Sequence, residues 1–98
     1  MRKIRLGVNI DHVATLRNAR NENFPNLLDV SKILKEIQVD SITVHLREDR
    51  RHIRDKDVID LKEKNYLPLN LEMAATKEMK DLCLKILPES CCIVPERR

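Results

Sequence analysis

Short segments with alternating apolar residues and longer segments with helical apolar spacing follow one another along the whole chain. The two-residue period of a β-strand occurs in four segments: 4–10, 41–46, 67–72 and 91–94. Between them, apolar residues recur every three or four positions, as on one face of a helix, in three segments: 25–37, 55–61 and 76–86. The predicted order is β-α-β-α-β-α-β, which is typical of a parallel sheet with right-handed helical crossovers.

The apolar residues of these segments define an expected core. In the first strand they are Ile4, Leu6, Val8 and Ile10, and in the first helix they are Leu27, Val30, Ile33, Leu34 and Ile37. Pro25 and Asn26 are expected to open that first helix, and Asp55 and Thr76 are expected N-caps of the next two. Free cysteine is among the most buried residue types, so Cys83, Cys91 and Cys92 are predicted to be core residues.

The opposite faces of the first three strands become polar toward their carboxyl ends. Their alternate residues are Gly7, Asn9 and Asp11, then Thr43, His45 and Arg47, then Asn70 and Glu72. Central strands of a doubly wound sheet lie under helices on both faces and read as nearly continuous apolar runs. A sheet that closes into a barrel explains the polar faces better, because they then converge on the lumen and its carboxyl-end mouth.

A barrel of this kind needs about eight strands, and the pattern supplies half of them. The predicted fold class is α/β, with residues 1–98 as the N-terminal half of a single (β/α)₈ TIM-barrel domain. The first and fourth strands are then open edges, which favour pairing with another chain. The half-barrel alone is expected to self-associate or aggregate.

Composition excludes several classes of function. The 98 residues carry a formal net charge of +3 with both signs interspersed, which is a weak signal for nucleic acid. No apolar run is long enough for a membrane span or follows the basic N-terminus as in a secretion signal, so a cytoplasmic protein is expected. Gly7 is the only glycine, which excludes a glycine-rich phosphate loop. No zinc-ligand spacing is present.

The polar positions include residue types suited to acid–base chemistry and to phosphate binding. At a barrel mouth, His45 and Glu72 are candidate acid–base groups. The guanidinium of Arg offers a planar fork of donors to oxyanions, so the candidate phosphate ligands are Arg20, Arg47 and His52. A polar cluster closes the first strand and consists of Asn9, Asp11 and His12.

Two other functions stay open from the residues alone. A metal-dependent barrel hydrolase would use as ligands His45, Glu72, Asp11 and His12. A non-enzymatic module would bind anions or RNA through residues 47–57, where five basic side chains lie among four acidic ones. The near balance of charge and the lack of interleaved aromatic residues argue against the RNA-binding module.

Four motifs occur in order along the chain: Gly-Val-Asn-Ile-Asp-His at 7–12 with Ala-Thr-Leu-Arg-Asn-Ala-Arg at 14–20, Thr-Val-His-Leu-Arg-Glu-Asp-Arg-Arg-His-Ile at 43–53, Asn-Leu-Glu-Met-Ala at 70–74, and Val-Pro-Glu-Arg at 94–97. Together they resemble the motifs of the pyridoxine 5'-phosphate synthase family. The resemblance implies a (β/α)₈ barrel in an octamer, acting without metal or organic cofactor. The family condenses 3-amino-2-oxopropyl phosphate with 1-deoxy-D-xylulose 5-phosphate and releases pyridoxine 5'-phosphate, inorganic phosphate and water.

The resemblance also implies a role for each matching residue. Asn9 and Arg20 would contact the amino ketone phosphate. The deoxyxylulose phosphate would be contacted by Asp11, His12, Arg47 and His52. His45 and Glu72 would accept protons. Family members are more than twice as long, and a proton-donating histidine lies in their other half, so the 98 residues alone are expected to be inactive.

Overall fold

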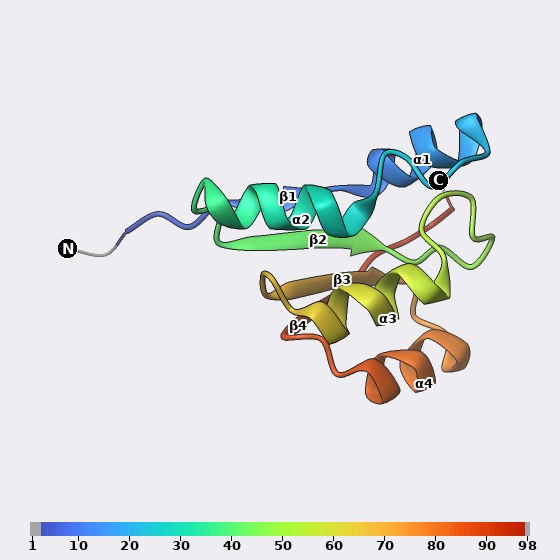
Figure 1. Ribbon diagram of the computed structural model, residues 1–98. Helices are drawn as coiled ribbons and strands as arrows, with labels where there is room; N and C mark the ends of the chain where they lie inside the picture. Colours follow the sequence, from blue (N-terminus) through green and yellow to red (C-terminus); the bar gives the residue numbers. More distant parts are fainter. Residues whose placement is uncertain (1–2, 98) are drawn as a thin grey trace.

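Four parallel strands form one sheet in chain order, β1-β2-β3-β4 (Figure 1). The computed structural model describes residues 3–97, so residues 1–2 and 98 of the predicted domain lie outside the described part. The elements are β1 Gly7–Asn9, α1 Asp11–Arg20, α2 Leu27–Glu36, β2 Ser41–His45, α3 Asp55–Lys64, β3 Leu69–Met73, α4 Lys77–Ile86 and β4 Ser90–Ile93. The predicted parallel α/β architecture is confirmed.

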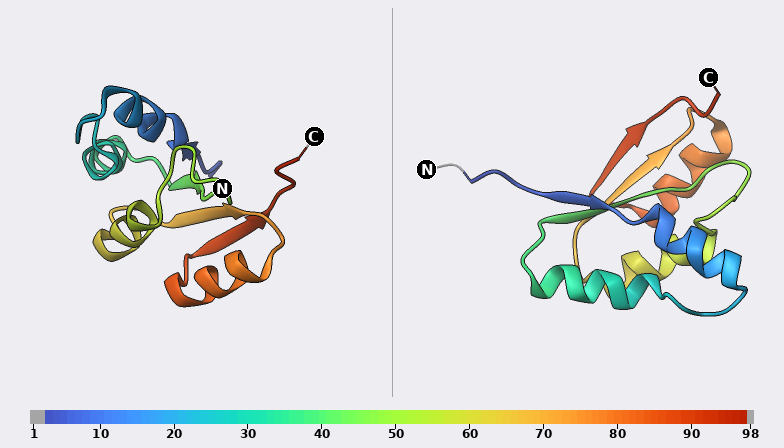
Figure 2. Two further views of the ribbon diagram at one scale, coloured as in Figure 1. Left: turned by 90° about the vertical axis from the view of Figure 1, so that its right-hand side faces the viewer. Right: turned by 90° about the horizontal axis from the view of Figure 1, so that it is seen from above.

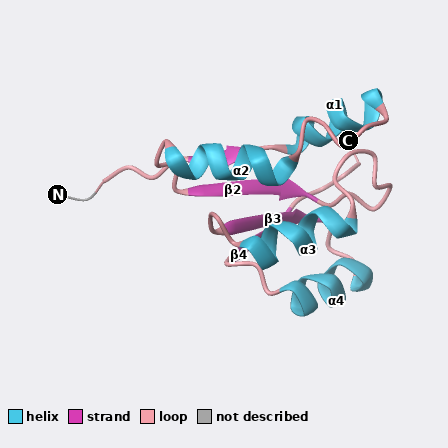
Figure 3. Cartoon of the chain, in the orientation of Figure 1, coloured by secondary structure: helices cyan, strands magenta, loops and turns pink. Residues whose placement is uncertain are grey.

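Helices α2, α3 and α4 cover one face of a curved sheet (Figures 2 and 3). The core lies between this face and the helices α2, α3 and α4. Strand residues that are at most 1% exposed are Ile42, Val44, Leu69 and Leu71, and apolar residues of α3 and α4 that are at most 2% exposed are Val58, Leu61 and Met79. The core is therefore aliphatic, in a chain whose Phe, Tyr and Trp residues are only Phe24 and Tyr66.

Helix α1 is absent from the predicted order. Asp11, predicted on the first strand, is instead the first residue of this helix, and β1 ends at Asn9. The Asn9 side-chain oxygen accepts the backbone N–H of Asp11 at 2.9 Å, which turns the chain out of the strand. The helix lacks an apolar stripe, because it buries Ala14 together with the polar Asp11 and Arg17. The spacing of apolar residues in the sequence therefore did not predict helix α1.

Two apolar predictions at the N-terminal side are wrong. Ile4 is 91% exposed and Leu6 is 58% exposed, because this stretch runs out beyond the helices that cover the sheet (Figure 1). In α2 only one flank of the wide apolar stripe faces the sheet. Leu27 is buried there, whereas Ile33 is 56% exposed and Ile37, the residue after the helix, is 66% exposed.

Helix starts follow the expected side chains in two of three cases. The Asn26 Oδ1 accepts the N–H of Leu28 at 2.8 Å, and Thr76 Oγ1 accepts the N–H of Met79 at 3.2 Å. Asp55 is not a cap but the first residue of α3. Asp57 instead bonds to the start of this helix, since its Oδ2 accepts the backbone N–H of Arg54 at 2.8 Å.

The cysteines are not buried core residues. Cys83 is half-buried, and Cys91 and Cys92 are exposed. Both exposed residues lie on β4, the last strand of the sheet, whose residues are all exposed. Their apolar surroundings in the sequence indicated a core, but an edge strand with no neighbour on one side cannot provide one.

Candidate functional site

Asn9, His45 and Glu72 meet at the carboxyl ends of three adjacent strands, on the face opposite the helices. We call these three residues the polar rim. His45 and Glu72 are direct partners in the register of β2 and β3. The Asn9 Nδ2 lies 3.4 Å from Glu72 Oε1, although β2 separates their strands. Strands two places apart lie about 9.5 Å from each other in a flat sheet, so this contact indicates a concave face.

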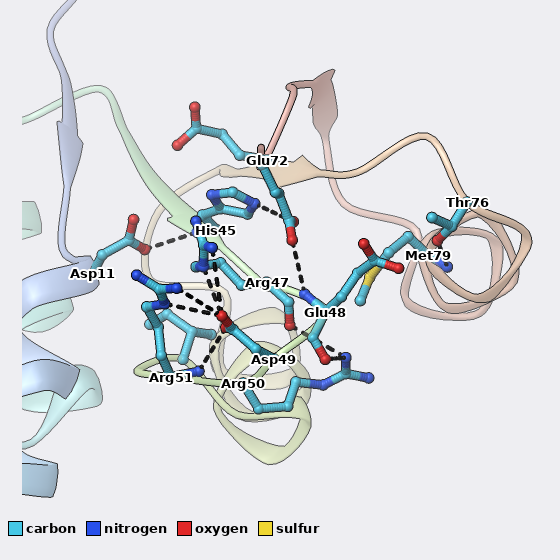
Figure 4. A network of polar contacts seen from close by, with 12 residues as sticks. Asp11, His45, Arg47, Glu48, Asp49, Arg50, Arg51, Glu72, Thr76 and Met79 are labelled. Carbon is cyan, nitrogen blue, oxygen red and sulfur yellow. Dashed lines mark hydrogen bonds and ion pairs between the residues drawn. The ribbon is translucent and has the colours of Figure 1, made fainter. Parts of the chain in front are cut away.

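The carboxylate of Asp11 links β1 to β2 by hydrogen bonds next to the polar rim. Its Oδ1 accepts the backbone N–H of His45 at 2.7 Å (Figure 4), and its Oδ2 accepts Asn9 Nδ2 at 3.1 Å. The residue is only 7% exposed. Because the carboxylate bonds the backbone of His45 and the side chain of Asn9, it fixes the relative positions of two rim residues.

Glu96 is a site residue that the candidate set omitted. Its Oε2 lies 2.7 Å from His45 Nε2, and its Oε1 accepts the backbone N–H of Glu48 at 3.1 Å. Burial raises the pKa of Glu96, but the Glu48 N–H and His45 outweigh it and the net pKa lies below the ordinary value. The sequence position of Glu96 could have identified it as a site residue, because it follows the fourth strand at the same end of the sheet as the polar rim.

His12 and His52 form an edge-to-face pair near Asp11. Their ring centroids are 5.9 Å apart. His52 is 7% exposed, and its Nδ1 accepts the N–H of Ile53 at 2.8 Å. Burial lowers the pKa of His52, and Asp11 opposes the shift without cancelling it. His12 is exposed and lies 3.2 Å from Thr15 Oγ1 through its Nδ1.

Two polar residues that the candidate set also omitted, the buried Arg17 and the half-buried Asn18, hold the segment of His52. Asn18 Nδ2 donates to the carbonyl of His52 at 2.9 Å. Arg17 pairs with Asp57 through two hydrogen bonds of 2.6 and 2.9 Å and also reaches the His52 carbonyl at 3.4 Å. Arg17 and Asn18 lie within a sequence motif already quoted, but only the folded chain brings them against the segment after β2.

The two candidate phosphate-binding arginines lie in different places. Arg47 is half-buried after β2, and its Nε donates to Asp49 at 3.2 Å (Figure 4). Hydrogen bonds from Arg51 and then Arg47 strongly lower the pKa of Asp49. Arg20 ends α1, where it is bound to Glu22 at 3.3 Å and lies over Phe24. No bond joins it to another candidate residue within the described chain.

An open hollow of about 500 Å³ adjoins Glu96 and is lined by Glu48, Ala74, Ala75 and residues 93–97.

Within residues 3–97, no three His, Cys, Asp or Glu side chains are placed so that they could hold a metal ion. No helix in this range has the length and hydrophobicity to cross a membrane.

Comparison with known proteins identifies the relatives of this sequence. A pyridoxine 5'-phosphate synthase of Thioalkalivibrio sulfidiphilus is 57% identical over 95 residues, which cover 97% of this chain and 39% of the relative. The synthase of Rhodospirillum rubrum is 58% identical over 97 residues, with 99% and 39% covered. That of Ehrlichia ruminantium strain Gardel is 56% identical over 98 residues, with 100% and 41% covered. The chain thus spans about two fifths of the length of these relatives.

The family profile described as pyridoxal phosphate biosynthesis protein PdxJ matches residues 6–98. Proteins of this family fold as (β/α)₈ barrels, and the match covers their N-terminal part. The concave parallel sheet, with polar residues at one end and helices on the outer face, fits that assignment. The chain belongs to the PdxJ family of pyridoxal phosphate biosynthesis proteins.

Proposed function

We propose that the barrel to which these residues belong condenses 3-amino-2-oxopropyl phosphate with 1-deoxy-D-xylulose 5-phosphate. The products are pyridoxine 5'-phosphate, inorganic phosphate and water, and the site is the polar rim. The observation that carries the proposal is the convergence of Asn9, His45 and Glu72 at the carboxyl ends of adjacent strands. Catalytic residues of barrel enzymes lie at this end. The names of the relatives supply the product.

His45 and Glu72 act as proton acceptors in this proposal. Joining an amine to a ketone, losing water and closing a ring each require protons to leave carbon, nitrogen or oxygen at defined positions. A side chain within hydrogen-bond reach typically contributes about 10²- to 10⁴-fold to such a step. Both residues are half-buried on the concave face, with exposed surface left for a substrate.

The remaining candidates bind the two phosphorylated substrates. We assign Asn9 and Arg20 to the amino ketone phosphate, which requires Arg20 to exchange its surface partner Glu22 for the substrate. The deoxyxylulose phosphate is assigned to Asp11, His12, Arg47 and His52. The cluster of His12, His52 and Asp11 supports this assignment, since the two rings form an edge-to-face pair and the charge of Asp11 acts on His52.

The 98 residues alone are proposed to be inactive. A proton-donating histidine and part of the phosphate pocket belong to the other three fifths of the family barrel. Without those groups the substrates lose much of their positioning, which can contribute about 7–11 kcal/mol to lowering a barrier. We further propose an octameric enzyme that works in the cytoplasm, needs no metal or organic cofactor, and has no nucleic-acid or membrane partner.

A chimera tests this function directly. Residues 1–98 replace the matched two fifths of the Ehrlichia ruminantium synthase, and pyridoxine 5'-phosphate formation is measured from the two substrates. The chimera should be active, and the 98-residue chain alone should not. Glu72→Gln and His45→Gln should each lower kcat by about 10²-fold or more, as expected for loss of a proton acceptor.

Glu63→Gln is the control, because it makes the same chemical change as Glu72→Gln on the exposed end of α3, away from the rim. It should leave kcat unchanged. A folded chimera that makes no product would refute the assigned reaction. Full activity in both rim variants would refute the assigned residues.

A further inference from the structure

His45 is bound through one ring nitrogen to a carboxylate that lies far away in the sequence. Glu96 Oε2 contacts Nε2 at 2.7 Å, and the two side chains are 8% and 13% exposed, respectively. The second oxygen of Glu96 is held by the N–H of Glu48 at 3.1 Å. Both oxygens are thus engaged, and the carboxylate cannot rotate freely. No hydrogen bond to His45 Nδ1 is found among residues 3–97.

We propose that Glu96 is a positioning residue that holds the proton of His45 on Nε2 and leaves Nδ1 as the atom that accepts protons from the substrate. The inference rests on the proposed function of His45. A carboxylate has only acceptor sites, so a neutral imidazole that bonds to it must carry its hydrogen on the contacting nitrogen. The other nitrogen then has the lone pair. The partner of one ring nitrogen commonly selects the tautomer of a histidine in this way.

The charges around His45 come from every neighbouring element. Asp11 bonds its backbone N–H from the start of α1, Glu72 is its partner on β3, and Glu96 follows β4. Arg47 and His52 come from the segment after β2; Arg47 helps to lower the pKa of Glu96, and His45 helps to lower the pKa of His52. Of these groups, Glu96 is the one whose bond reaches the imidazole itself.

Replacing Glu96 by glutamine should reverse the bond. The backbone N–H of Glu48 needs an acceptor and therefore keeps the amide oxygen of Gln. The amide NH₂ then faces His45 Nε2, which must become the acceptor. The ring proton moves to Nδ1, and the proposed proton acceptor is lost with almost no change in side-chain volume. Glu96→Asp retains a carboxylate and should retain the Nε2–H tautomer.

The tautomer is measurable by ¹⁵N NMR of histidine-labelled protein, recorded at a pH high enough for the imidazoles to be neutral. In the 98-residue chain and in the chimera, His45 Nε2 should give the signal of a protonated nitrogen and Nδ1 that of an unprotonated one. Glu96→Gln should exchange the two signals, whereas Glu63→Gln should not. An Nδ1–H tautomer in the unsubstituted protein would overturn the proposal.

Kinetics of the chimera provide the second readout. Glu96→Gln should lower kcat by about 10²- to 10⁴-fold, the contribution of a positioned acid–base group, with KM nearly unchanged because Glu96 does not touch the substrate. Glu96→Asp should recover part of kcat. Wild-type kcat in an active Glu96→Gln chimera would refute the inference while leaving the reaction intact. If the chimera is inactive, the proposed reaction fails, and the NMR signals still decide where His45 holds its proton.

Discussion

At the scale of single residues, His52 shows how burial sets the state of a titratable group. Its Nδ1 accepts the N–H of Ile53, so this nitrogen must be unprotonated in the folded chain. Protonation would break that bond and place a charge in a buried position. Burial and the nearby basic groups lower the pKa, and Asp11 only partly compensates. We therefore expect a neutral His52 at pH 7.

The lowered pKa of His52 predicts a specific pH dependence of stability. The unfolded chain takes up a proton at His52 near the ordinary pKa of about 6.5, whereas the folded chain does so only at lower pH. Stability therefore rises with pH across this window and is lost as pH falls below about 6.5. The free energy of unfolding in urea, measured from pH 5 to 8, should fall less steeply at the acid side in His52→Asn than in the unsubstituted chain.

This comparison separates His52 from the other two histidines, since His12 and His45 are present in both proteins. Asparagine is chosen because its side-chain oxygen can accept the Ile53 N–H in place of Nδ1. Parallel pH profiles for the two proteins would show that His52 has the same pKa in the folded and unfolded states, contrary to the prediction.

The residues of the site differ in how far the sequence reveals them. Asn9, His45 and Glu72 lie within strands. The alternation of side chains along a strand predicts the face of the sheet on which each lies, and the end of the strand predicts its position along the sheet. Glu96 and Arg20 lie outside strands, so no period constrains them. The sequence alone therefore missed the bond of Glu96 to His45 and did not anticipate that Arg20 would be directed toward Glu22.

At the scale of elements, the Arg17–Asp57 pair joins α1 to α3. The two side chains are 9% and 14% exposed and form two hydrogen bonds. Removing one partner of such a pair leaves an uncompensated buried charge, which typically costs about 3–5 kcal/mol. Asp57→Asn should therefore lower the free energy of unfolding in urea by an amount near the low end of that range, since the amide oxygen can still accept one bond.

The control for Asp57→Asn is Asp60→Asn on the same helix. Asp60 pairs with Lys56, whose side chain is 83% exposed, and pairs of this exposed kind contribute about 0–1 kcal/mol. Equal losses in the two variants would mean that the buried pair contributes no more than the surface pair. Because Arg17 also bonds the His52 carbonyl, the NMR signals of His52 should shift in Asp57→Asn and not in Asp60→Asn.

The contrast between α1 and α2 shows what limits prediction of elements from the sequence. Helix α2 could be predicted because it packs on the sheet through apolar residues and is capped by Asn26. Helix α1 lies beyond the strand ends and uses Asp11 and Arg17 as its buried residues. Their burial depends on partners more than thirty residues away in the sequence, so the local periodicity of apolar residues does not predict it.

At the scale of the whole molecule, the sheet formed by residues 3–97 has two unpaired edges, β1 and β4. The sheet is curved, but its four strands do not close it, so the two edge strands do not pair with each other. Strand β4 is exposed along its length, and Ile93 on it is 62% exposed. Such an edge presents backbone donors and acceptors beside apolar surface, which favours pairing with another chain.

The 98-residue chain should therefore sediment as a mixture of monomer and larger species whose proportion rises with concentration. A lysine on an edge strand opposes pairing because its charge would have to be buried between chains. Ile93→Lys should shift the sedimentation velocity distribution toward monomer. Ile37→Lys makes the same change at a residue that is 66% exposed after α2, away from β4, and should leave the distribution unchanged. A chain that is monomeric at every concentration, or an equal effect of the two lysines, would contradict pairing through this edge.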